Sequence, residues 1–138
     1  MNKAEILEFL NSNPMCRLAT VEGDQPRVRG MMMYRADENG IVFHTGGPKD
    51  LFRQLRANPK VEVCFNNADN SKQVRVAGTA ELVEDDALKR EIVEARPFLK
   101  PIVEAYGSDL LKVFRITRCV ATVWTMEMNL RPKEYVRL

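Results

Sequence analysis

Closely spaced turn residues divide most of this chain into short extended runs. Gly23 and Asp24 form one turn signal and residues 37–40 form a second, with apolar and β-branched residues between them. Seven runs follow this pattern, at residues 15–21, 25–34, 41–45, 61–65, 73–83, 111–116 and 119–126. A doubly wound parallel sheet would need a helix between most strand pairs. The pattern therefore predicts antiparallel strands in mostly sequential order.

Short helical segments lie before and between these runs. Asn2 can cap a helix near the N-terminus, and residues 49–57 place apolar side chains on one helix face. Asp85 can cap a third segment, and a fourth ends at Gly107. We therefore predict a mainly β fold with α elements, in which an antiparallel sheet of six to seven strands closes into a small barrel with short helices on its outside.

The composition fits one soluble domain over residues 1–138. A chain of this length can bury roughly two thirds of its unfolded surface, enough for a core without metal or disulfide bonds. Its 21 Lys and Arg against 19 Asp and Glu exclude a polybasic arm. No stretch approaches the ~18 apolar residues of a membrane span, so we expect a cytoplasmic protein without a membrane partner.

Residue types that bind metals or act as nucleophiles are sparse. Cys16, Cys64 and Cys119 lack the close spacing of zinc and redox motifs, and we expect buried thiols. His44 is the only histidine, which excludes a histidine metal site and a Ser-His-Asp triad with a spare partner. A hydrogen-bonded histidine at a strand end is the expected role. The sequence predicts no metal and no catalytic side chain.

A basic strand and a glycine-led helix start together predict a phosphate site. Arg27 and Arg29 are two residues apart on one strand and project from the same face, and a guanidinium can bind two phosphate oxygens at once. Gly47 allows close backbone approach, and Lys49 falls in the first helical turn, where the dipole disfavours a cation unless an anion is present. The alternatives are a solvated edge strand for the arginines and a solvated Lys49 compensated by Asp50.

Two other groups could contact a flat ligand. Residues 31–33 are three methionines, whose soft side chains could wall an aromatic ring or fill gaps in a core. Gln73 shares a strand face with Arg75, and its amide suits the edge of a polar heterocycle. A single-stranded nucleic acid would need aromatic residues between the arginines for base stacking. The basic strand offers only Tyr34, so no nucleic-acid partner is expected.

Several of these motifs also occur in an informative order along the chain. They occupy residues 18–20, 27–34, 41–45, 47–49, 57–59 and 73–78, followed by Glu81. In this order the sequence resembles the pyridoxamine 5'-phosphate oxidase-like flavin-binding family, and most closely its short bacterial members of the general stress protein and nitroimidazole-resistance types. The resemblance is strongest over residues 15–84. It implies a split β-barrel that forms a homodimer and binds FMN at the subunit interface.

The resemblance implies roles for individual residues. Arg29 and Lys49 would hold the flavin phosphate, and residues 30–33 would run beside the isoalloxazine ring. His44 and Thr45 match an aromatic-threonine pair whose backbone lies near the flavin. The predicted cofactor-binding residues are Arg29, Gly30, Met31, Met32, His44, Thr45, Gly47, Lys49 and Gln73, the last as the glutamine that contacts the cofactor.

Departures from the family pattern argue against pyridoxamine phosphate oxidation. Tyr34 stands where the oxidase has a lysine for the substrate phosphate, and Pro48 stands where its pattern has an arginine. Trp124 and Arg131 are the only candidates for its C-terminal Trp and Arg pair. We therefore expect an FMN oxidoreductase that passes electrons from a reduced nicotinamide to a small acceptor, with the flavin doing the redox chemistry. The alternative is a non-enzymatic flavin-binding, small-ligand-binding or stress protein.

Overall fold

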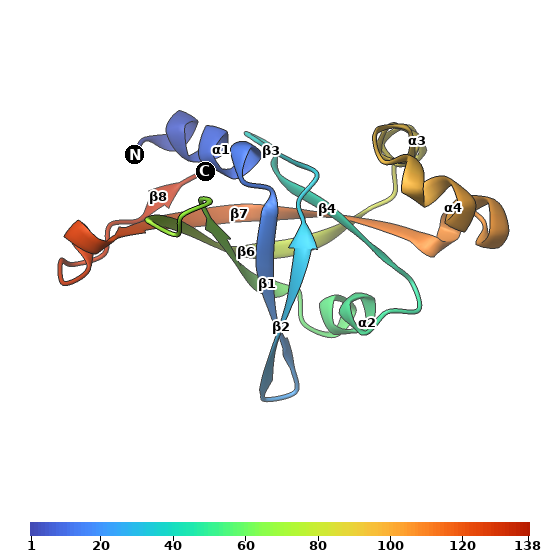
Figure 1. Cartoon of the computed structure of the whole chain (residues 1–138). Coiled ribbons are helices and arrows are strands. Elements are labelled where there is room, and N and C mark those ends of the chain that lie inside the picture. The colour runs from blue at the N-terminus through green and yellow to red at the C-terminus, as the bar shows by residue number, and fades with distance from the viewer.

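Eight antiparallel strands in one sheet form the body of the structure, a computed structural model that describes residues 1–138 (Figure 1). The strands are β1 (Met15–Glu22), β2 (Gln25–Met32), β3 (Arg35–Asp37), β4 (Gly40–Gly46), β5 (Lys60–Asn66), β6 (Lys72–Val83), β7 (Leu111–Thr125) and β8 (Val136–Arg137). Hydrogen bonds join them in the order β2-β1-β5-β6-β7-β4-β3, with β8 on β7. The predicted class, a mainly β split barrel with flanking helices, is confirmed.

The sheet differs from the prediction in closure and in strand number. Its hydrogen-bonded ladder ends at β2 on one side and at β3 on the other, so the ladder does not close. The sequence pattern does not reveal β3 and β8, because strands of three and two residues show no periodicity. β2 ends two residues earlier than predicted, because the amides of Met33 and Tyr34 donate to the carbonyls of Pro14 and Val42.

A single long strand, β7, replaces the two strands predicted at residues 111–116 and 119–126. Arg118 adopts a positive φ of 54°, and the register with β6 shifts between Ala77 and Thr79. Gly78 lies at this bulge, where a Cβ atom would stand 2.6 Å from Cγ2 of Ile116. The apparent break in the sequence pattern is therefore a bulge, which bends the strand pair without ending it.

Four α-helices lie around the sheet: α1 (Lys3–Ser12), α2 (Asp50–Ala57), α3 (Asp86–Ala95) and α4 (Lys100–Tyr106). As predicted, the Asn2 side chain accepts a hydrogen bond from the Glu5 amide at 2.9 Å, and Asp85 caps α3 in the same way. Lys49 immediately precedes α2, so the prediction that it lies in the first turn is wrong by one residue. Figure 1 shows α3 and α4 together at one end of the sheet, with α1 toward the other end.

The apolar core determines where these helices sit. Phe43, Phe65 and Phe114 are its largest buried side chains, and the rings of Phe43 and Phe114 stack 5.6 Å apart. A second, smaller cluster joins the α3–α4 segment to β4 and β7 through Leu88, Ile92, Leu99, Val42, Leu111 and Val113. Burial of these side chains holds this segment, here called the helical insert (residues 86–106), against the sheet.

The three cysteines are unpaired. Cys16 and Cys119 are buried, as predicted, and burial raises the pKa of each thiol to about 11. Cys64 is only half-buried. No group of three or more His, Cys, Asp or Glu side chains gathers where it could hold a metal ion. None of the helices combines the length and the apolar character that crossing a bilayer requires.

Candidate functional site

A groove of about 1260 Å³ lies between β2, the end of β4, the start of α2 and the helical insert. Most of the predicted cofactor-binding residues line it: Arg29, Gly30, Met31, Met32, His44, Thr45 and Lys49. Gly47 sits between two lining residues, and its amide donates to the Leu110 carbonyl at 2.8 Å. Gln73 is not part of the groove and lies on β6 opposite Trp124 of β7. The fold therefore gathers segments that are far apart in the sequence and leaves out Gln73.

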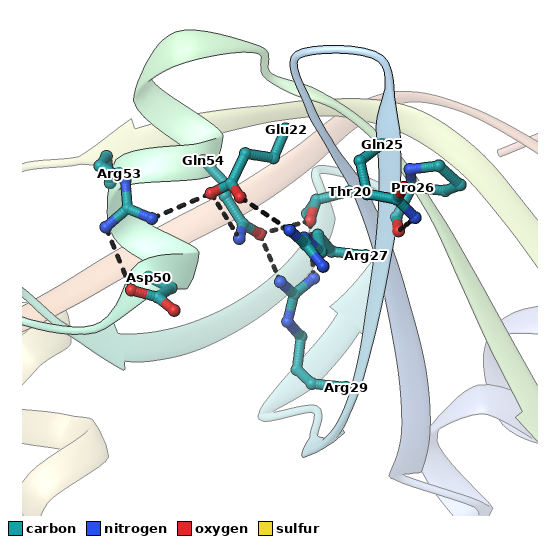
Figure 2. Close-up of polar contacts among 9 residues, drawn as sticks. All are labelled: Thr20, Glu22, Gln25, Pro26, Arg27, Arg29, Asp50, Arg53 and Gln54. Carbon is teal, nitrogen blue, oxygen red and sulfur yellow. Dashed lines mark hydrogen bonds and ion pairs between the residues drawn. The ribbon is translucent and has the colours of Figure 1, made fainter.

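Three neutral acceptors hold Arg29 in place, and two of them, Thr20 and Gln54, are drawn with it in Figure 2. Its Nη1 donates to the Leu18 carbonyl at 3.2 Å and to Oγ1 of Thr20 at 2.7 Å, and its Nη2 donates to Oε1 of Gln54. Thr20 and Gln54 are only 2% and 4% exposed, and the Thr20 hydroxyl donates to the same Gln54 oxygen at 2.7 Å. The Nε–H and one N–H of Nη2 make no hydrogen bond within the protein. Arg29 thus keeps a two-donor fork for an anion.

Partial burial lowers the pKa of Arg29, while Asp50 and Glu22 act in the opposite direction. An arginine remains protonated at physiological pH even after such a shift. Neither carboxylate lies within ion-pair distance of Arg29, so its charge is not neutralised by direct contact. A partly buried, oriented guanidinium without a direct carboxylate partner is suited to binding a phosphate.

Arg27, by contrast, belongs to an exposed cluster around Glu22. The Glu22 carboxylate accepts hydrogen bonds from Arg27 at 3.2 Å, from Arg53 at 2.9 Å and from Nε2 of Gln54 at 3.3 Å. These hydrogen bonds, that from Arg53 first, lower the pKa of Glu22. Arg27 therefore fits the alternative of a solvated edge strand, and the two arginines do not act as a pair.

Lys49 stands at the start of α2, and its exposed side chain makes no ion pair. Asp50 lies in the first turn of α2 and pairs with Arg53 at 3.1 Å. Both parts of the alternative, a solvated Lys49 and a carboxylate in the first helical turn, are therefore present, without a direct contact between the two side chains. The amides of Asp50 and Leu51 donate to no carbonyl, as is usual for a helix start. Arg29, Lys49 and these two amides are the anion-binding groups of the groove, here called its cationic end, and the carboxylates of Glu22 and Asp50 line the groove as well.

The three methionines divide between the two roles that the sequence left open. Met33 is 1% exposed and belongs to the core, whereas Met31 is half-buried and Met32 is 47% exposed, and both line the groove. Facing residues come from the helical insert: Phe98, Leu99, Ile102 and Val103, here called the apolar wall. Phe98 and Ile102 are exposed at 63% and 42%. Next to its cationic end the groove therefore has apolar sides.

Arg96 is a groove residue that the sequence pattern did not indicate. Its Nη1 lies 2.7 Å from Nε2 of His44 and donates to the Met32 carbonyl at 3.2 Å. Its Nη2 donates to the Met33 carbonyl at 2.7 Å. Arg96 follows the last residue of α3, and no periodicity or motif at that position marks a long-range contact. Only the fold brings this residue to His44.

His44 is neutral in the folded protein. Burial is the main cause that lowers its pKa, and the nearby charges of Arg96 and Lys49 lower it further, to about 4. The expected role of a hydrogen-bonded histidine near a strand end is confirmed by the contact with Arg96. At neutral pH the ring therefore carries no charge and acts only through its hydrogen bonds.

Among the positions compared with the oxidase pattern, Pro48 lines the groove, whereas Tyr34, Trp124 and Arg131 do not. The Tyr34 hydroxyl donates to Glu91 of α3 at 2.6 Å, and burial followed by this hydrogen bond raises the pKa of Tyr34. Trp124 donates to the Asn129 side chain at 2.8 Å, and Arg131 lies 3.8 Å from Glu127.

Known sequences share the central part of this chain. The sequence pattern of the family described as "Pyridoxamine 5'-phosphate oxidase" matches residues 3–118. The pyridoxine/pyridoxamine 5'-phosphate oxidase of Rhizobium leguminosarum bv. trifolii is 34% identical over 86 residues, which are 62% of this chain and 41% of that enzyme. The matched region therefore spans about two fifths of the length of that curated relative.

Solved structures share nearly the whole fold. A NimC/NimA family protein from Clostridium acetobutylicum superposes with a TM-score of 0.79 at 28% identity, over 98% of this chain and 92% of that one. General Stress Protein 26 from Bacillus anthracis has a TM-score of 0.71 at 19% identity, over 99% and 98%. An FAD-binding protein from Mesorhizobium loti has a TM-score of 0.65 at 21% identity, over 91% and 96%. Because the family pattern covers most of the chain and agrees with its fold, the chain belongs to the pyridoxamine 5'-phosphate oxidase family.

Proposed function

We propose that this protein binds FMN in the groove and acts, as a cytoplasmic homodimer, as an oxidoreductase that passes electrons from a reduced nicotinamide to a small acceptor. The observation that carries the proposal is the free fork of Arg29 in a groove that Lys49 and several apolar side chains also line. FMN has a matching shape, with a phosphate at one end and a flat ring system at the other. Family membership and the FAD-binding neighbour support a flavin.

Different groove residues would bind the phosphate and the ring of FMN. Arg29, Lys49 and the first amides of α2 would bind the phosphate, and the backbone of Gly30 and the side chains of Met31 and Met32 would flank the ring. A Cβ at Gly30 would meet only Cδ of Arg17, at 4.0 Å, so packing within the chain does not require glycine there. Close approach of the flavin ring to the backbone would explain the glycine at position 30. Bound FMN would supply the electron transfer, and the protein would supply orientation and access.

Two features of the single chain support the proposed homodimer: an exposed apolar edge strand and the position of Gln73. β2 is an edge strand, and Val28 and Met32 on it are 70% and 47% exposed, with Met15 of β1 at 56%. Apolar side chains in such a strip favour a covering partner. Gln73 lies outside the groove of its own chain, so it would reach a flavin only from a second copy. A monomer in sedimentation experiments at micromolar concentration would remove this part of the proposal.

The first test is flavin binding itself. Freshly purified protein should be yellow, or should quench the fluorescence of added FMN, and chromatography of the released flavin distinguishes FMN from FAD. Arg29→Ala and Lys49→Ala should each weaken FMN binding by about 10- to 100-fold, the usual effect of losing charge-assisted hydrogen bonds. Arg27→Ala is the matched control, because Arg27 also borders the groove but is already paired with Glu22, and it should change affinity by less than about threefold. Colourless protein without quenching, or equal losses in all three variants, contradicts the proposal.

The second test separates turnover from binding alone. Steady-state oxidation of NADH or NADPH is measured with the flavin-loaded protein and a trial acceptor, including a nitroaromatic compound. Acceptor-dependent oxidation supports an oxidoreductase. Stable flavin binding without oxidation of any reduced nicotinamide would favour the non-enzymatic alternative. Pyridoxamine 5'-phosphate serves as the negative control substrate, because Tyr34 occupies the oxidase's lysine position and is bound to Glu91.

A further inference from the structure

The contact between Arg96 and His44 determines which nitrogen of the imidazole carries the proton. Nη1 of Arg96 lies 2.7 Å from Nε2 of His44. A guanidinium has only N–H donors, so Nε2 must be the acceptor. A neutral ring that accepts at Nε2 carries its hydrogen on Nδ1. The other two partners of Arg96, the carbonyls of Met32 and Met33, are also acceptors, which agrees with donation to all three groups.

The Nδ1–H group of His44 has no partner in the protein. Arg96 provides the only side-chain hydrogen bond of this histidine. The buried side-chain nitrogen and oxygen atoms that lack a partner are Nε of Arg35 and Nε of Arg115, so Nδ1 of His44 is not sealed from solvent. Because His44 lines the groove, its free N–H is available to a molecule bound there.

The charges around His44 keep this arrangement stable at neutral pH. Arg96, at the end of α3, and Lys49, at the start of α2, are both cations and oppose a second proton on the ring. No carboxylate contacts the ring and favours the imidazolium. His44 is therefore a neutral donor of fixed orientation in the groove that the cationic end and the apolar wall also line.

We propose that Arg96 is a positioning residue that fixes His44 as the Nδ1–H tautomer, and that His44 thereby donates a hydrogen bond to a neutral acceptor atom of the ligand in the groove. The acceptor is a carbonyl oxygen or an unprotonated ring nitrogen, atoms that flavins and many small electron acceptors carry. The choice of FMN as the probe rests on the proposed function, whereas the tautomer is a property of the protein alone.

The tautomer can be measured without any ligand. Because the chain has one histidine, ¹⁵N spectra of the uniformly labelled protein contain a single pair of ring signals. At pH 7 we expect a protonated-type shift for Nδ1 and an unprotonated-type shift for Nε2. In Arg96→Met this preference should be lost, and the titration midpoint of the ring should rise toward the ordinary value. A wild-type ring protonated on Nε2 contradicts the proposal whether or not FMN binds.

The donor role is tested with FMN as the ligand. Addition of FMN should shift the Nδ1 signal, and an unchanged signal at saturating FMN contradicts the donor role. His44→Asn places an amide N–H close to the position of Nδ1 and should retain FMN affinity within about threefold, whereas His44→Phe should lose up to about tenfold. Thermal unfolding of both variants shows whether they are folded. Equal affinities of the Asn and Phe variants would also contradict the donor role, and a protein that binds no FMN would refute the proposed function while leaving the tautomer result intact.

Discussion

Arg29 and Arg96 line the same groove, and each makes three hydrogen bonds to neutral acceptors, yet their surroundings differ. Two acceptors of Arg29, Leu18 and Thr20 on β1, lie outside the groove lining, and the third, Gln54 on α2, borders the groove but is almost fully buried, so the arginine is fixed and its remaining donors are free. The acceptors of Arg96 are Met32, Met33 and His44, two of which line the groove themselves, and its guanidinium lies 5.4 Å from the centre of the Tyr34 ring. Under the proposed function, an arginine would therefore bind the ligand directly in one place and organise the ligand's surroundings in the other.

The difference can be traced to what each arginine connects. Thr20 and Gln54 are almost fully buried, so they form a rigid support that cannot move without disturbing the core. Arg96 joins the helical insert to the sheet at a place where the neighbouring residues are exposed, including Phe98 at 63%. We therefore expect substitutions at the support of Arg29 to act mainly on stability and affinity together. Substitutions at Arg96 should act mainly on the insert.

The largest effect is expected from Gln54→Leu. This change leaves the Thr20 hydroxyl without its acceptor and removes one acceptor of Arg29, and an unsatisfied buried polar group costs about 1–3 kcal/mol. Urea unfolding should show a loss of about 2–3 kcal/mol in the free energy of unfolding, and FMN quenching should show weaker binding. A variant with wild-type stability and affinity would mean that Arg29 does not need this support.

A smaller loss is expected from Arg96→Met, which keeps the length of the side chain. Three hydrogen bonds disappear: Met32 and His44 are partly exposed and can bind water instead, whereas Met33 is 1% exposed and its carbonyl loses this partner, so the free energy of unfolding should fall by about 1–2 kcal/mol. Limited proteolysis should become faster within residues 86–106, while Gln54→Leu should not show this selectivity. Uniform cleavage along the chain would show that Arg96 does not hold the insert.

The pH dependence of stability should report on His44. Its pKa is lowered from 6.5 to about 4 in the folded protein, chiefly by burial, so the unfolded chain takes up the proton first as the pH falls. Stability should therefore be lost as the pH decreases from 6.5 toward 4, by about 1.5 kcal/mol between pH 6.5 and 5. His44→Asn cannot titrate in this range, and the difference between its unfolding curve and that of the wild type isolates the effect. Parallel curves would contradict the lowered pKa.

The smallest effect is expected from Arg27→Ala. Its ion pair with Glu22 joins side chains that are 50% and 36% exposed, and Glu22 keeps Arg53 and Gln54 as partners. Exposed ion pairs of this kind contribute about 0–1 kcal/mol, so the midpoint of urea unfolding should hardly change. A loss comparable to that of Gln54→Leu would remove the distinction between the two neighbouring arginines.

The arrangement of strands could be read from the sequence wherever the signals are local. Turn residues at Gly23 and Asp24 and alternation over residues 73–83 predict β1, β2 and β6, and the caps at Asn2 and Asp85 predict α1 and α3. The bulge at Gly78 could not be read in the same way. It depends on the close approach of Ile116, which is distant in the sequence.

By itself the sequence determined the local elements and the chemistry available near them: two arginines on one strand, a lysine at a helix start, a methionine run and one histidine. Tertiary structure decided which of these groups are used together. In the folded protein Arg27 pairs with Glu22, whereas Arg29 donates hydrogen bonds to Thr20 and Gln54. Arg96 contacts His44, and Gln73 lies outside the groove. The physical reason is that strand and helix signals depend on neighbours within a few residues, whereas the partner of a polar side chain is whichever acceptor the packed elements place within about 3 Å.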